Sequence, residues 1–150
     1  AGEVNTSMPH FVIDKVMHAL NDHGKALKGS KVLVLGVAYK RDIDDVRESP
    51  ALDIIRLLEE RGAHVEFYDP FVHQFREEGH VRTGVELSDD MLRWADAVVV
   101  VTDHTNVDYQ RVVDHAALLV DTRNVTAGLK AGRARIIPLA SGTRTVGATS

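Results

Sequence analysis

Three polar stretches carry the residue types best suited to chemistry. They read "AYKRDIDDVRES" (38–49), "TDHTN" (102–106) and "DTRNV" (121–125), and each comes at the end of an apolar run. Lys40 offers a compact positive charge, and Arg41 and Arg123 offer planar guanidinium groups, so these three side chains suit phosphate oxygens. The pattern therefore indicates an anion-binding site, if folding brings the three stretches together.

Other residues in these stretches have structural interpretations that compete with functional ones. We expect Arg47 to pair with Asp45 and thereby to structure the loop, and Ser49 to cap a helix that begins at Pro50. A fully solvated charged loop over 38–49 is the alternative. His104 could act as a general base, but spacing identifies no Ser or Cys partner for it. A turn or capping role for Thr102, Asp103 and His104 is the favoured prediction.

The chain around the first stretch opens like a dinucleotide-binding unit, with an apolar strand, a glycine, a loop, a helix and a second strand. However, Gly36 is followed by Val37, Ala38, Tyr39 and Lys40, so the G-x-G-x-x-G turn is absent. Only Asp69, at the end of the second strand, resembles the acid that holds a ribose. The sequence therefore predicts no NAD site in this chain.

The alternation of expected strands and helices predicts a doubly wound, Rossmann-like α/β sandwich with five or six mostly parallel strands. In such a sheet ligands bind beyond the carboxyl ends of the strands, where the three polar stretches would converge. The expected strands are 31–38, 64–70, 97–102, 117–124 and 134–140, with a short edge strand in 81–87. The expected helices are 49–62, 88–96 and 106–116.

A further helix is expected over residues 9–23, before the first strand. Pro9 suits its first position, Gly24 is a plausible stop, and Val12, Ile13 and Val16 belong to a single apolar stripe. This helix either packs on its own sheet or reaches out as a linker or dimer helix. The sequence leaves both open.

Composition excludes several classes of function. The chain has 150 residues, a net charge of −4 and no cysteine, which argues against nucleic-acid binding, thiolate metal sites and cysteine catalysis. No apolar run is long enough to span a membrane, and the eight histidines lack metal-ligand spacing. We expect a cytoplasmic protein without a metal. The missing initial Met and the polar residues from about 141 are typical of cut or frayed ends.

The string "GVAYKRDIDDVRESPALDIIRLLEERGAHVEFYDP" resembles the C-terminal domain of the UDP-glucose/GDP-mannose dehydrogenase family. Within this family the sequence is most similar to UDP-N-acetylhexosamine 6-dehydrogenases. The opening "VNTSMPHFVIDKV" resembles the end of the family's central connecting region. The resemblance implies two parts, a linker helix in 1–28 and a nucleotide-sugar-binding domain in 29–150.

The resemblance also implies a function. Family enzymes oxidise the C6 alcohol of a UDP-sugar to a carboxylate in two NAD-dependent steps, through a cysteine-bound intermediate. Tyr39 and Lys40 match the family's aromatic-lysine pair at the substrate, and Arg123 matches the arginine that reaches the nucleotide sugar. Asp45, Arg47 and Ser49 match the rest of the motif, which we interpret as loop structure.

Two departures limit this interpretation. Without a cysteine or a glycine fingerprint the chain has neither the nucleophile nor the NAD site, so we expect no catalytic residue and no activity from it alone. Its expected partners are a UDP-sugar and the missing NAD-binding and central domains, in a homodimer or larger assembly. The alternatives are a stand-alone nucleotide- or anion-binding module and an oligomerisation unit.

Overall fold

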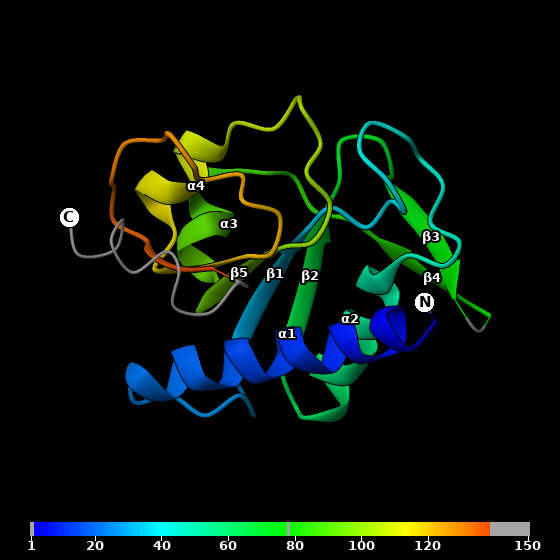
Figure 1. Cartoon of the computed structure of the whole chain (residues 1–150), viewed down its shortest axis with the longest axis horizontal. Coiled ribbons are helices and arrows are strands. Elements are labelled where there is room, and N and C mark those ends of the chain that lie inside the picture. The colour runs from blue at the N-terminus through cyan, green and yellow to red at the C-terminus, as the bar shows by residue number, and fades with distance from the viewer. Residues whose placement is uncertain (1, 78, 139–150) are drawn as a thin grey trace.

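Five parallel strands form one sheet in the order β2-β1-β5-β6-β7, of which Figure 1 labels β2, β1 and β5. The computed structural model describes residues 2–77 and 79–138, with side chains from residue 8 onward. The strands are β1 (Lys31–Leu35), β2 (His64–Tyr68), β5 (Ala97–Val100), β6 (Leu118–Asp121) and β7 (Arg135–Pro138). After β2 the chain returns to the other side of β1. The strand order therefore reverses between β1 and β5, and this is the switch point of the sheet.

Helices cover both faces of the sheet, which confirms the predicted doubly wound sandwich. The helices are α1 (Gly2–Asp22), α2 (Pro50–Glu60), α3 (Asp89–Trp94) and α4 (Tyr109–His115). Alternate strand residues face opposite layers, so Val34 and Val99 pack with α1 and α2, whereas Leu35 and Val98 pack with α3 and α4. Near-continuous apolar strands are needed because both faces are buried.

Helix α1 packs on its own sheet through the apolar stripe that includes Val12, Ile13 and Val16, each at most 1% exposed. The expected helix start at Pro9 is wrong, because α1 already begins at Gly2 and Pro9 lies inside it. A proline there lacks the N–H for one intrahelical hydrogen bond. Pro9 is itself buried, so its ring is part of the packed face.

The remaining helices start at residues whose side chains accept backbone hydrogen bonds. Ser49 accepts one from the Ala51 amide at 3.2 Å, with Pro50 as the first helical residue, and Gly62 follows the helix end with φ 91°. Ser88 caps α3 and Asp108 caps α4. The last cap differs from the expectation, which placed Thr102 or Asp103 at this end of the helix.

A small antiparallel hairpin, β3 (Gln74–Glu77) with β4 (His80–Thr83), stands beside the main sheet. The sequence predicted only an edge strand over 81–87. The sequence did not predict β3 because Phe75 is its only buried residue, and one apolar residue gives no clear alternation of apolar and polar positions. Residues 139 and 140 of the last expected strand, and the tail from about 141, lie outside the described residues.

Candidate functional site

The turn after β1 opens the loop that carries the candidate binding residues. Strand β1 ends at Leu35, three residues earlier than expected, because Gly36 adopts φ 88°. A Cβ on Gly36 would lie 2.5 Å from the carbonyl oxygen of Thr102. Only glycine fits both constraints. The space beside this glycine is therefore occupied by the protein's own β5 loop and not by a bound phosphate.

Asp69, the residue in the place of a ribose-binding acid, faces inward. It is 2% exposed, and its Oδ1 accepts hydrogen bonds from the amides of Phe71 (2.8 Å) and Val72 (3.1 Å). Its Oδ2 accepts hydrogen bonds from the amides of Val37 (2.8 Å) and Ala38 (3.1 Å). Protein groups surround the buried carboxylate, so it is not available to a ribose. Together with the turn at Gly36, this shows that the residues present do not fit a dinucleotide.

His104 is also buried at this edge, at 1% exposure. Its Nδ1 accepts a hydrogen bond from the Asp42 amide at 2.8 Å, and its Nε2 lies 2.8 Å from Asp69 Oδ2. The ring of Phe71 packs against it, with 4.9 Å between ring centroids. Both ring nitrogens are occupied, so His104 does not serve as a general base. It structures a loop, although not by capping a helix.

Arg41 and Arg123 come together on one carboxylate, although they lie far apart in the chain. Arg41 Nη2 donates to Asp103 Oδ2 at 2.6 Å, and Arg123 Nε lies 3.7 Å from Asp103 Oδ1. Burial tends to raise the pKa of Asp103, but the hydrogen bond from Arg41 and both positive charges hold it below its ordinary value. Both guanidinium groups remain about half exposed, so they can contact a dissolved anion.

Tyr39 and Lys40 stand on the exposed part of the same loop. The Tyr39 amide donates to the carbonyl of Asp45 at 2.6 Å, while its ring is 47% exposed. The Lys40 ammonium lies over this ring, 5.6 Å from its centroid. An aromatic ring and an ammonium are therefore presented together, in the residues that directly precede Arg41 in the chain.

The residues expected to structure the loop lie at its far end. Arg47 donates to both carboxylate oxygens of Asp45, at 3.1 and 2.9 Å, and its amide donates to Asp45 Oδ1 at 2.9 Å. These bonds lower the pKa of Asp45 to about 2. Ser49 is 3% exposed and its hydroxyl lies within 3.4 Å of the Ala38 carbonyl. It links the end of the loop to its start.

Arg123 is placed by a turn that the sequence pattern did not single out. Asp121, at the end of β6 and 2% exposed, accepts hydrogen bonds from the amides of Arg123 (3.1 Å), Val125 (3.1 Å) and Thr126 (3.0 Å). Asn124 takes φ 65° within this turn. The sequence signal that could have predicted this turn is an acidic residue at the end of a buried strand. Asp69 is also an acid at the end of a strand, and both acids accept hydrogen bonds from backbone amides.

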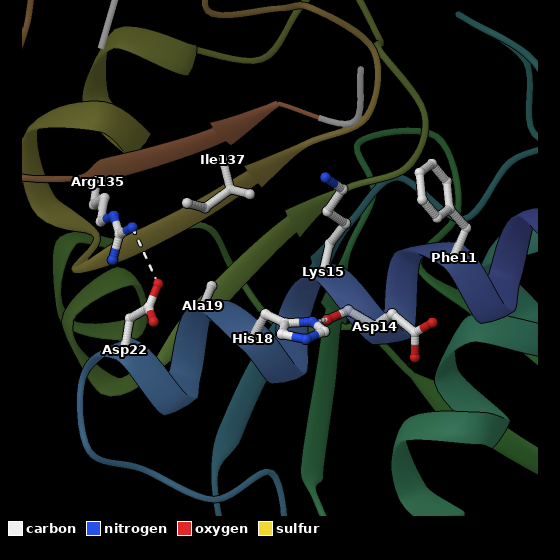
Figure 2. A pocket seen from close by; sticks show the side chains of 8 residues that line it. All are labelled: Phe11, Asp14, Lys15, His18, Ala19, Asp22, Arg135 and Ile137. Atoms are coloured by element: carbon white, nitrogen blue, oxygen red, sulfur yellow. Dashed lines mark hydrogen bonds and ion pairs between the residues drawn. The ribbon is translucent and has the colours of Figure 1, made fainter. Parts of the chain in front are cut away.

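A groove of about 420 Å³ lies elsewhere, between α1 and β7 (Figure 2). Phe11, Lys15 and His18 of α1 line one side and Ile137 lies opposite, while Arg135 pairs with Asp22 at 3.2 Å. None of the candidate anion-binding residues lines it. Within residues 2–77 and 79–138, no cluster of His, Asp or Glu could hold a metal ion, and no helix is long and apolar enough to cross a membrane.

Residues 33–128 match the model of the UDP-glucose/GDP-mannose dehydrogenase family, UDP binding domain. The chain belongs to this family. It is 31% identical over 133 residues to the UDP-N-acetyl-D-mannosamine dehydrogenase of Methanococcus vannielii, with 83% of this chain covered. It is 33% identical over 133 residues to the UDP-glucose 6-dehydrogenase TuaD of Bacillus subtilis, with 82% covered.

Solved structures of family members have the same fold. The UDP-N-acetyl-mannosamine dehydrogenase Cap5O of Staphylococcus aureus superposes with a TM-score of 0.70 at 30% identity, over 93% of this chain and 32% of its own. An NDP-N-acetyl-D-galactosaminuronic acid dehydrogenase of Methanosarcina mazei gives 0.74 at 26% identity, over 91% and 30%. The chain likewise spans 29% and 27% of the two curated relatives. This family domain is thus about a third or less of such enzymes.

Proposed function

We propose that this domain binds the nucleotide end of a UDP-sugar through Tyr39, Lys40 and Arg123. The phenol ring covers the base or ribose, and the ammonium and guanidinium groups neutralise the diphosphate. Asp45, Arg47 and Ser49 hold the loop that presents Tyr39 and Lys40. Arg41 is an additional cation beside them.

The observation that carries this proposal is the convergence at the switch point of the sheet. The β1 loop and the β6 turn deliver Arg41 and Arg123 to the same carboxylate, within 2.6 and 3.7 Å. Tyr39 and Lys40 directly precede Arg41 in the chain, and the Lys40 ammonium lies over the ring of the exposed Tyr39. Positive groups and an aromatic face at this edge are what a nucleoside diphosphate requires. The match to a UDP-binding family domain supports the same ligand.

The wider activity belongs to a longer enzyme. By resemblance to its family, we propose that the domain serves a cytoplasmic, NAD-dependent dehydrogenase that oxidises the sugar C6 alcohol to a carboxylate. The chain lacks a cysteine, and the residues around Gly36 and Asp69 do not fit NAD. We propose that the nucleophile and the NAD site come from other domains, and that the longer enzyme is a homodimer or a larger assembly. Residues 1–28 would connect to them.

Calorimetry with UDP, UMP and NAD on this chain tests the nucleotide assignment. We expect UDP to bind and NAD not to bind, and Lys40→Ala and Arg123→Ala each to weaken UDP binding by at least ~1 kcal/mol, as for charge-assisted hydrogen bonds. Lys28→Ala and Arg61→Ala remove the same charges outside these loops and serve as controls. Equal UDP affinity in all four variants would contradict the assignment.

An assembly role is the second candidate, and the groove between α1 and β7 favours it. Phe11 is 47% exposed, and among the described residues that line the groove Ile137 is the other large apolar one. A monomer at high concentration in light scattering would count against this role. The UDP titration does not depend on it, so the two candidates can be separated.

A further inference from the structure

The segment Thr102–Thr105, after β5, is hydrogen-bonded residue by residue to the loop after β1. Thr102 Oγ1 donates to the Ala38 carbonyl at 2.6 Å, and Asp103 accepts from Arg41 at 2.6 Å. His104 accepts from the Asp42 amide, and Thr105 donates to both carboxylate oxygens of Asp42 at 2.9 Å. Tyr39 and Lys40 lie between the Ala38 and Asp42 contacts. The β5 loop thus brackets the two exposed residues.

The bonding pattern of His104 fixes its tautomer. A backbone amide can only donate, so Nδ1, which faces the Asp42 amide at 2.8 Å, carries no proton. Nε2 then carries the ring proton and donates it to Asp69 Oδ2 at 2.8 Å. The imidazole is therefore neutral and joins a buried carboxylate to a loop amide.

Asp69 ties the other end of the same loop. Its Oδ2 binds the amides of Val37 and Ala38, where the loop begins, and also His104, which binds the amide of Asp42. These hydrogen bonds form a closed circuit. Asp69 accepts from the amides at the start of the loop and from His104, and His104 accepts from the Asp42 amide further along the same loop. Asp42 sits at its closing point with φ 61°, a conformation that Asp tolerates better than most residues.

We propose that His104 is a positioning residue for nucleotide binding, which holds Tyr39 and Lys40 in place through the Asp69–His104–Asp42 circuit. This inference rests on the proposed function of the loop. It adds a residue that contacts no ligand and that acts through its Nδ1 bond to the Asp42 amide. Preorganising the loop lowers the entropy lost when the nucleotide binds.

Two substitutions separate the two bonds of the ring. His104→Asn keeps an acceptor near the position of Nδ1 and loses the donor to Asp69, whereas His104→Gln keeps a donor near Nε2 and loses the acceptor for Asp42. His64→Gln, in an exposed residue at the start of β2, is the matched control. Urea unfolding identifies conditions under which all variants are folded. Nitrogen-15 NMR reports the tautomer, backbone amide exchange reports the loop, and calorimetry reports UDP affinity.

We expect the wild-type ring to carry its proton on Nε2 and the Asp42 amide to exchange slowly. His104→Gln should speed exchange at residues 39–42 and weaken UDP binding about tenfold, the effect of one such bond. His104→Asn should keep the Asp42 amide protected and bind UDP within about threefold of wild type, even though both variants lose stability. A merely structural role would weaken UDP binding alike in both.

Four results would overturn the proposal. They are a proton on Nδ1, unchanged exchange at residues 39–42 in His104→Gln, equal UDP affinity in folded wild type and His104→Gln, and UDP binding weakened alike in His104→Gln and His104→Asn. If the wild-type chain binds no UDP, the proposed function fails for this chain. The tautomer and the exchange rates do not require UDP, so they still decide whether His104 positions the loop.

Discussion

Exposed and buried carboxylates have different roles at the carboxyl edge of this sheet. Asp69 and Asp121 are 2% exposed and bind backbone amides that shape the loops. Asp45 is partly exposed and binds Arg47, a side chain that is itself 86% exposed. Solvent screens such a pair, so it contributes little to global stability. Its effect should be measured on the titration of Asp45 itself.

Arg47→Gln should raise the pKa of Asp45 from about 2 toward its ordinary value of 3.8. The hydrogen bonds from Arg47 favour the ionised carboxylate, so what stabilisation they give is present above about pH 3.8 and is lost as the pH falls through about 2. Carboxyl carbon-13 shifts of Asp45 followed across the acid range from neutral pH would report the midpoint. Arg61→Gln is the control, and an unchanged midpoint in Arg47→Gln would contradict the pairing.

The sequence predicted which residues lie near the site better than it predicted which way they face. Polar residues after buried strands mark the carboxyl edge, and the structure brings Arg41 and Arg123 together there, while their part in binding stays a prediction. Nothing in a single sequence distinguishes an inward Asp69 or His104 from an outward one. That choice depends on contacts between segments about 30 to 65 residues apart, which local patterns do not contain.

At the scale of elements, the starts of α2 and α3 followed local chemistry, whereas the end of β1 and the hairpin β3–β4 did not. Ser49 with Pro50 and Ser88 with its acidic first turn are local signals, and the structure begins α2 and α3 after these residues. Strand β1 ended early for a reason that is not local, because Gly36 must turn against the Thr102 backbone. This turn sets where the binding loop begins.

Gly36→Ala should therefore be strongly destabilising, by about 3 kcal/mol or more, because the new Cβ meets backbone atoms at a positive φ. Gly128 has a similar φ of 82°, but a Cβ added there would meet nothing within 4 Å. Gly128→Ala should cost only about 1 kcal/mol from backbone strain. Urea unfolding of both variants checks the difference, and equal losses would show that Thr102 can move away from the turn.

At the scale of the whole molecule, α1 packs against the sheet and against α2. It buries Ile13 and Val16 in the same cluster as β1, β5 and α2. Its opposite side, which includes Phe11, borders the groove with β7 (Figure 2). One helix therefore has one surface in the core and another available to solvent, and the two can be tested separately.

Ile13→Ala should lower the free energy of unfolding by about 2–5 kcal/mol, since it removes buried methylene groups and leaves a cavity under the sheet. Phe11→Ala, two residues earlier and 47% exposed, should cost about 1 kcal/mol or less. Urea unfolding of the whole chain gives both values. If Ile13→Ala lowered the free energy of unfolding no more than Phe11→Ala, α1 would not be packed on the sheet in solution. The helix would then act as a linker whose apolar stripe packs against another domain. A large loss in Ile13→Ala alone would make α1 part of the domain that carries the nucleotide site, so that any motion of this domain in a longer enzyme must hinge before the helix or within its first turns.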